Sequence, residues 1–332
     1  MIFTLPPANS PHIPPANVSA LQIQSSDTFH NPNHPDAIKR LILKHLVTQS
    51  IAQNESEQIV TGVEIIDMKA HTSMVSHNSD TEHFAASINK LPVTLLILQD
   101  LRAEKIDLNQ TVSWASTDVR AGVGVYDQPG APLQATVKDV IYDLLNRSGN
   151  TAVRILVNNL LGGAAVVNQR FAAIPQLAHT RLQPLDANRF YVGNTTPRDA
   201  MWTMEQLLTK QDKYGTFING ALQTNIYTDV SVRSQLAGND FIVLVNKVGL
   251  LDDVEGNNRH DVGVIYNTKT RQSYGYSLFT TAPYESEMAT IRAEESLKEM
   301  GRYTLRYSGD RKKQSAELRT SSKVQAEKRT LY

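Results

Sequence analysis

The sequence contains no cysteine among its 332 residues. Disulfide bonds, thiolate metal ligands and a cysteine nucleophile are therefore excluded. Neither sign of charge is in excess, because Lys+Arg and Asp+Glu both total 33 and the formal net charge is +0. This balance removes the electrostatic argument for binding nucleic acid or an anionic membrane surface, so we expect no nucleic-acid partner.

Long apolar runs and targeting signals are also missing. No run reaches the roughly 20 residues that a membrane-spanning helix needs, so we expect no transmembrane segment. The N-terminal stretch MIFTLPPANSPHIPPANVSA has neither the basic region nor the apolar core of a signal peptide. The nine histidines show no H-E-x-x-H pattern, and there is no P-loop, so we expect no metal ion and no cofactor.

The composition nevertheless supports a folded protein, because 41% of residues are hydrophobic and 20% are charged. Residues 1–35 are rich in Pro, Asn, Ser and His without a sustained period, so we predict a flexible arm. Residues 36–305 carry the periodic patterns and are predicted to form one domain. Residues 306–332 are charged and are predicted to form a tail.

Hydrophobic periodicity predicts the elements of this domain. Strands rich in Val, Ile and Thr are predicted as a pair within 59–78 and singly at 241–246, 262–267 and 274–282. Helices are predicted from Asp36, over 88–108, 136–146, 151–161, after Gly163, from the N-cap Thr196 and over 286–305. Residues 176–196 are predicted to be irregular.

The order of these elements predicts an α/β protein of the α+β type. Its antiparallel sheet would come from both ends of the chain and be flanked by the N- and C-terminal helices, in residues 36–85 and 205–305. Residues 86–204 would form an all-helical inserted subdomain. A cleft between the two parts is the expected place for a functional site.

Ser87-Ile88-Asn89-Lys90 is the only S-x-x-K in the chain, at a predicted strand-to-helix junction. Residues three apart on a helix share a face, so the Ser87 hydroxyl and the Lys90 amine can meet. A serine needs a base to act as a nucleophile, and a lysine whose pKa is lowered by burial can serve. The alternative is a chance match, because roughly one S-x-x-K is expected at this Ser and Lys content.

Two further short motifs follow in order. Ser148-Gly149-Asn150 lies at a break between predicted helices, and Lys247-Val248-Gly249 directly follows the apolar stretch 241–246. A turn can carry a hydroxyl and an amide across a cleft, and Gly249 would let a ligand approach the strand backbone. Alone, each motif also fits an ordinary turn or a solvated strand end.

Together the three motifs resemble the S-x-x-K, S-D-N and K-T-G signatures of the serine β-lactamases and penicillin-binding D,D-peptidases, the class A β-lactamases above all. The resemblance spans about residues 36–305. It implies that Ser87 is acylated, that Lys90 is its general base or proton relay, and that Ser148 passes a proton to the leaving nitrogen.

The same resemblance implies how a substrate is held. Asn150 would bind the substrate amide, and Lys247 would support Ser148 and the substrate carboxylate. The backbone amides of Ser87 and Leu250 would form the oxyanion hole. Val248 stands where K-T-G has Thr, so the hydroxyl that contacts the carboxylate is missing. Arg259 or His260, on the next strand, is the candidate for a compensating positive group.

Two more departures concern the turn and the deacylation loop. Gly149 stands where S-D-N has Asp, which predicts a looser turn. The class A loop R-L-D-x-x-E-x-x-L-N corresponds to RLQPLDANRF at 181–190, and no Glu occurs between Thr151 and Met204. Asp186 stands at the position of the deacylating Glu with a shorter side chain, so it is either a poorly placed base or an ordinary loop aspartate.

Three functions remain open. The chain is a β-lactam-acylated hydrolase, a D,D-peptidase or esterase-like relative, or a non-catalytic binder of cell-wall peptide or another partner. We expect a small-molecule β-lactam or a cell-wall peptide as its partner. The resemblance implies an extracytoplasmic location, periplasmic or secreted. Tyr126, Tyr191 and Tyr266 either line the cleft or pack in the core.

Overall fold

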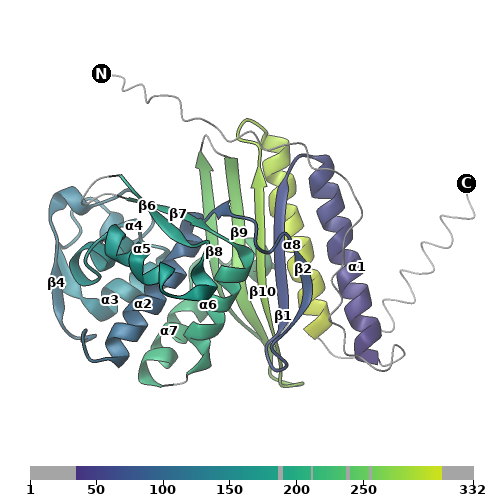
Figure 1. Ribbon diagram of the computed structural model, residues 1–332, viewed down its shortest axis with the longest axis horizontal. Helices are drawn as coiled ribbons and strands as arrows, with labels where there is room; N and C mark the ends of the chain where they lie inside the picture. The colour runs from purple at the N-terminus through teal and green to yellow at the C-terminus, as the bar shows by residue number, and fades with distance from the viewer. Residues whose placement is uncertain (1–34, 186–189, 211, 237–239, 254–255, 309–332) are drawn as a thin grey trace, which may run out of the picture.

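The computed structural model describes residues 35–185, 190–210, 212–236, 240–253 and 256–308 (Figure 1). The flexible arm was predicted over residues 1–35, of which the structure describes only Pro35, the first residue of a helix. The tail was predicted over residues 306–332, and those beyond Ser308 lie outside the described residues. The last helix continues to Ser308, three residues past the boundary predicted at 305.

A five-stranded sheet in the order β2-β1-β10-β9-β8 forms the centre of the molecule. Every pairing in it is antiparallel, and β1 pairs with β10 from Val60↔Thr281 to Asp67↔Tyr274. The predicted sheet drawn from both ends of the chain is therefore confirmed. Its strands are β1 (Val60–Asp67), β2 (Thr72–His77), β8 (Ile242–Asp253), β9 (Gly256–Asn267) and β10 (Gln272–Ala282).

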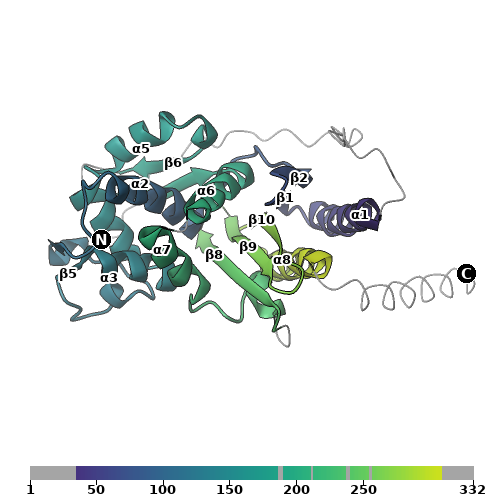
Figure 2. The same cartoon turned by 90° about the horizontal axis from the view of Figure 1, so that it is seen from below.

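The two terminal helices cover one face of this sheet (Figures 1 and 2). They are α1 (Pro35–Ser56) and α8 (Glu287–Ser308). Val47 and Met300 are fully buried in one apolar cluster with Tyr276 of β10. Strand β9 is buried along nearly its whole length, because both faces of the sheet are covered.

The opposite face of the sheet meets the helical part, which also contains two small sheets. The first has the order β3-β7-β6, and the second pairs β4 with β5. The α-helices are α2 (Lys90–Arg102), α3 (Val137–Tyr142), α4 (Asn150–Ile155), α5 (Ala164–Ala172), α6 (Pro197–Thr209) and α7 (Lys213–Gln223). The short strands are β3 (His83–Phe84), β4 (Thr111–Ser113), β5 (Gln134–Thr136), β6 (Arg181–Pro184) and β7 (Phe190–Thr195).

Short helical turns lie between these elements. Those near the candidate site are η1 (Ala86–Asn89), η3 (Val125–Asp127) and η4 (Asp143–Arg147). The prediction that residues 176–196 are irregular was wrong, because this segment contains β6 and β7. Helix α7 was not predicted, because Gly215 and Gly220 lower the helix propensity of its sequence. Helix α6 begins as predicted, with Thr196 as N-cap and Pro197 as its first residue.

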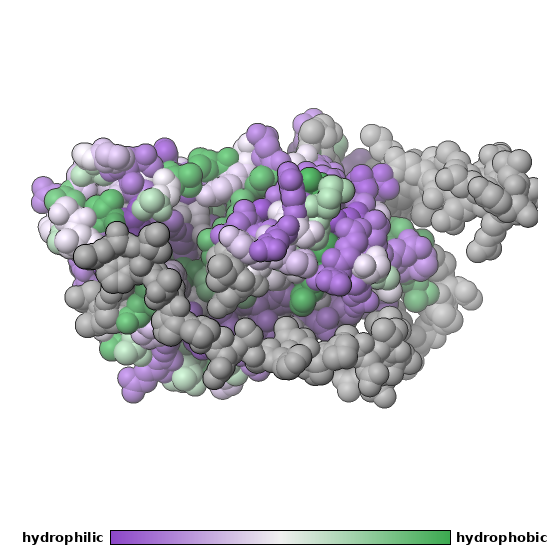
Figure 3. Space-filling view, turned by 90° about the horizontal axis from the view of Figure 1, so that it is seen from above, coloured by the Kyte–Doolittle hydropathy of each residue, from purple (hydrophilic) through white to green (hydrophobic). Residues whose placement is uncertain are grey.

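Exposed large apolar side chains are scattered over the surface. They include Leu41, Val123, Phe241 and Met288, which belong to different elements. The face shown in Figure 3 accordingly mixes hydrophilic and hydrophobic residues. No single helix among the described residues has the length and apolar character to cross a membrane, although the bent pair Asn150–Leu160 and Ala164–Ala172 passes that test by length and composition.

Candidate active site

The candidate nucleophile sits on a strained turn between the small sheet and the helical part. Ala86, directly before Ser87, has φ +45°, a conformation that L-residues rarely adopt. The Ile88 amide donates to the Ala85 carbonyl at 2.9 Å and starts the turn η1. This turn leads into α2 and leaves Ser87 half-buried, with its hydroxyl facing the Lys90 amine.

The Lys90 side chain is fully buried and makes four hydrogen bonds. Its Nζ donates to Ser87 Oγ at 2.9 Å, to Asn150 Oδ1 at 2.9 Å, and to both the carbonyl and the hydroxyl of Ser148 at 2.6 Å and 3.1 Å. Burial lowers the pKa of Lys90 to about 7, although the charges of Asp127 and Asp143 act in the opposite direction. A lysine with that pKa can accept a proton at neutral pH.

Lys247 also donates to the Ser148 hydroxyl. Its Nζ donates to Ser148 Oγ at 2.9 Å and to the Val248 carbonyl at 2.8 Å. Burial and the nearby Lys90 lower the pKa of Lys247 well below its usual value. Ser148 itself adopts left-handed backbone angles, φ 61° and ψ 37°, which carry its hydroxyl between the two lysine amines. The structure therefore brings the three sequence motifs together.

Tyr227 is a neighbour of this cluster that the sequence did not reveal. The Lys247 ammonium lies 5.6 Å from the centre of its ring, and its hydroxyl donates to the Arg147 carbonyl at 3.3 Å. Burial raises the pKa of this phenol. No motif marks the position, because Tyr227 reaches the site from the segment between α7 and β8.

Asn89, inside the S-x-x-K motif, faces away from Lys90 and fixes the loop strands. Its fully buried amide donates to the carbonyls of Arg181 at 3.1 Å, Asn194 at 3.0 Å and Val192. These bonds tie η1 to β6 and β7. The sequence analysis gave Asn89 no role, because it stands at one of the two variable positions of S-x-x-K.

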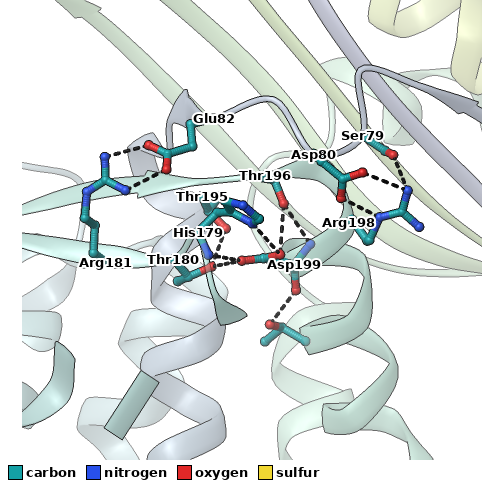
Figure 4. Close-up of polar contacts among 11 residues, drawn as sticks. Ser79, Asp80, Glu82, His179, Thr180, Arg181, Thr195, Thr196, Arg198 and Asp199 are labelled. Atoms are coloured by element: carbon teal, nitrogen blue, oxygen red, sulfur yellow. Dashed lines mark hydrogen bonds and ion pairs between the residues drawn. The ribbon is translucent and has the colours of Figure 1, made fainter. Parts of the chain in front are cut away.

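Ion pairs fix the segment that directly precedes Ser87, as Figure 4 shows. Glu82 receives two hydrogen bonds from Arg181 at 2.8 Å and 2.5 Å, and Asp80 receives one from Arg198 Nε at 2.6 Å. The buried Asp199 carboxylate accepts hydrogen bonds from the Thr180 and Thr196 hydroxyls. The segment before Ser87 is therefore bound to both β6 and α6.

Gly249 contacts the nucleophile turn rather than an open cleft. A Cβ built at Gly249 would lie 2.9 Å from Ile88 Cγ1 and 3.1 Å from the Ala85 carbonyl oxygen. The glycine is needed for this close approach of β8 to η1. Leu250, the next residue, is 39% exposed at the same strand edge.

Arg259 and His260 were expected to supply a positive group, and the structure corrects this. The Arg259 guanidinium pairs with Asp252 and with Glu294 of α8, so its charge is already neutralised away from the site. His260 is fully buried, stacked on Phe279 and bonded to the Phe84 carbonyl at 2.9 Å. Burial lowers its pKa to about 4, so it is neutral at physiological pH.

Asn150 and Asp186 are the remaining candidate residues. Asn150 lies in the site, with its Nδ2 donating to the Ala121 carbonyl at 2.8 Å. Asp186 lies outside the described residues. No group of three or more His, Asp or Glu residues within the described ranges is arranged to hold a metal ion.

A comparison with models of known protein families identifies the family of this chain. The model of the Beta-lactamase2 family, described as the beta-lactamase enzyme family, matches residues 43–307. The chain belongs to this family. A search of curated protein sequences gave no match.

Solved structures of beta-lactamases and of PBP-A share this fold. A beta-lactamase from Sphaerobacter thermophilus has 20% identity and a TM-score of 0.66, covering 80% of this chain and 97% of its own. One from Xanthomonas campestris has 16% identity and a TM-score of 0.67, covering 82% and 99%. A mutant of PBP-A, solved as an acyl-enzyme complex with penicillin G, has 17% identity and a TM-score of 0.65, covering 82% and 97%.

Two buried histidines beneath the nucleophile turn of this beta-lactamase family member predict acid sensitivity. Burial and the nearby His260 lower the pKa of His83 to about 3, while that of His260 is about 4. Below about pH 6.5 the unfolded chain binds protons that the folded chain does not, so stability is complete above that pH and falls toward pH 4. We expect a loss of about 2 kcal/mol per histidine at pH 5 relative to pH 7.

Urea unfolding at pH 5 and pH 7 measures this loss. His260→Phe should remove about half of the pH-dependent difference, whatever its effect on absolute stability. His45→Gln, on the exposed face of α1, should retain the full difference. Equal stability of the parent protein at the two pH values would contradict the prediction.

Proposed function

We propose that the chain is a serine hydrolase that forms an acyl-enzyme at Ser87 with a β-lactam or a related amide. The observation that most supports this function is the contact of the buried Lys90 amine with Ser87 Oγ at 2.9 Å. The pKa of Lys90, lowered to about 7, leaves a large share of the amine neutral at physiological pH. A neutral amine at hydrogen-bond distance is what an activated serine requires.

Acylation would begin with proton transfer from Ser87 Oγ to Lys90 Nζ as the oxygen bonds to the substrate carbonyl carbon. The carbonyl oxygen becomes negative and is stabilised by the backbone amides of Ser87 and Leu250. The carbon–nitrogen bond then breaks, and the leaving nitrogen takes a proton from Ser148 Oγ. Ser148 regains a proton from Lys90, which restores the neutral amine.

Substrate recognition would use Asn150 and Lys247. The Asn150 amide would bind the amide of the acyl side chain. Lys247 would hold the Ser148 hydroxyl in place and attract a substrate carboxylate. Arg259 and His260 do not assist, so we propose weaker binding of carboxylate-bearing substrates than K-T-G enzymes achieve.

Deacylation is the weak step of this function. The loop lacks Glu, and Gln183 and Phe190 replace two further polar positions of the class A pattern. We propose that Asp186 is at best a slow base, because a shortfall of about 1 Å can cost a hundredfold in rate. The PBP-A mutant solved as an acyl-enzyme complex with penicillin G supports β-lactam acylation on this fold. A D,D-peptidase-like activity is therefore the second candidate.

Labelling with a fluorescent penicillin tests the proposal. Intact-protein mass spectrometry should show one adduct per chain, absent in Ser87→Ala and hydrolysed slowly in the parent. Asp186→Asn should form the adduct at the parental rate and release it no faster. Rapid hydrolysis by the parent would show that the protein is an efficient lactamase and would contradict slow deacylation. The absence of both adduct and hydrolysis would refute the β-lactam assignment.

We also infer an extracytoplasmic location, periplasmic or secreted, because β-lactams and cell-wall peptides occur outside the cytoplasmic membrane. Fractionation of cells that express the full-length gene product would test it.

A further inference from the structure

The turn at Gly149 is closed by carboxylates from elsewhere in the chain. Gly149 is the N-cap residue of α4 and has no side chain to accept the first amides of that helix. The carboxyl groups of Asp127 and Asp143 come from η3 and η4, and both are buried against this turn. Two acidic groups thus surround a position where the S-D-N signature carries one.

Asp127 caps α4 in place of residue 149. Its Oδ2 accepts hydrogen bonds from the Asn150 amide at 3.0 Å and from the Gly124 amide at 2.9 Å. Its Oδ1 accepts from the Thr151 amide at 2.7 Å. One carboxylate therefore binds the first two amides of α4 and the loop before η3.

Asp143 fills the space that a side chain at 149 would need. Its Oδ1 accepts the Val125 amide at 2.7 Å. Its Oδ2 lies 2.1 Å from a Cβ built at Gly149 and 2.6 Å from one built at Gly124, far closer than real Cβ contacts. This oxygen is buried and has no hydrogen-bond partner among the described residues.

We propose that Asp143 and Asp127 together replace the aspartate missing from the second motif. We further propose that positions 143 and 149 depend on each other, because the Asp143 carboxyl group can occupy its site only when residue 149 is glycine. Both are positioning residues, which hold Ser148 and Asn150 against the Lys90 amine. The inference rests on the proposed function, since the position of Ser148 and Asn150 matters for acylation only if Ser87 is acylated. It corrects the expectation of a looser turn, because the two carboxyl groups accept four backbone hydrogen bonds. Two of these bonds come from the first amides of α4, and two come from Gly124 and Val125 in the adjoining loop.

A reciprocal exchange tests the linkage. Gly149→Asp alone places a side chain on Asp143 Oδ2, so we expect the rate of penicillin acylation to fall by roughly tenfold or more. Adding Asp143→Ala removes the clash and leaves the new Asp at the S-D-N position, so the double variant should recover to within about threefold of the parent. A parental rate in Gly149→Asp, or no recovery in the double variant, would overturn the proposal.

Thermal unfolding separates this inference from the proposed function. Gly149→Asp should lower Tm by roughly 5 °C, and the double variant should regain most of it. This pattern is expected even if the parent forms no adduct with penicillin, in which case the acylation proposal alone fails. Independent Tm effects that simply add in the double variant would refute the linkage.

The pH profile of acylation distinguishes positioning from mere folding. The charges of Asp127 and Asp143 raise the pKa of Lys90. The amine of Lys247 is a further charged neighbour of Lys90. Asp127→Asn removes one negative charge, so the midpoint of the acylation profile should move to lower pH. Asp139→Asn, exposed on α3, is the matched control and should leave the midpoint unchanged. An unmoved midpoint in Asp127→Asn would show that this carboxylate has no influence on Lys90.

Discussion

Replacing Lys90 by alanine is expected to slow acylation of Ser87 by about a thousandfold. Lys90 Nζ is the amine bonded to Ser87 Oγ, and it also bonds to both polar groups of Ser148. Its loss removes the proton acceptor and loosens Ser148 together. Stopped-flow measurement of adduct formation with a fluorescent penicillin gives the rate. Lys105→Ala, with an exposed side chain, is the control and should acylate normally.

The pH dependence of the same rate identifies the acceptor. Only the neutral amine accepts a proton, so acylation should rise with pH through about 7 and level off above it, following the lowered pKa of Lys90. The residual rate of Lys90→Ala should lack this rise. A parental rate that does not change between pH 6 and pH 9 would exclude Lys90 as the base.

The main sheet and the terminal helices could be predicted because part of each element carries a clear pattern. The predicted stretches 241–246, 262–267 and 274–282 are rich in Val, Ile and aromatic residues and fall on β8, β9 and β10, and α8 buries one face along its 22 residues. The first half of β9 was not predicted, because its sequence GNNRHD is polar and charged. The strands β6 and β7 could not be predicted in this way. They are short, and their pairing depends on the distant Asn89 amide and on Gly193, whose φ of +63° lets β7 lie against Arg181.

The convergence of Ser87, Ser148 and Lys247 followed from the order of three motifs, whereas the groups that hold them did not. Asp127 and Asp143 carry no spacing signal, because their contacts exist only once the chain before η3 folds back on α4. The prediction at Arg259 or His260 failed for a different reason. The ion pairs of Arg259 with Asp252 and Glu294 and the complete burial of His260 depend on the packing of α8 and the nucleophile turn against β9, which the local sequence does not reveal.

Gly249→Ala is expected to lower the acylation rate by about a hundredfold while the protein remains folded. The added Cβ would lie 2.9 Å from Ile88 Cγ1 and 3.1 Å from the Ala85 carbonyl, so β8 must move away from η1. The two proposed oxyanion donors lie on either side of that contact. The Leu250 amide follows Gly249 on β8, and the Ser87 amide precedes Ile88 on η1, so this packing sets the distance between them.

Gly220→Ala supplies the matched control for this change. No atom lies within 4 Å of the Cβ position at Gly220 of α7, so the variant should acylate normally and gain about 1 kcal/mol of stability from helix propensity. Circular dichroism and urea unfolding establish that Gly249→Ala is folded before its acylation rate is compared. A rate within threefold of the parent would mean that the β8–η1 contact does not set the oxyanion geometry. A hundredfold loss in a folded protein would instead assign Gly249 the role of spacing the two amides.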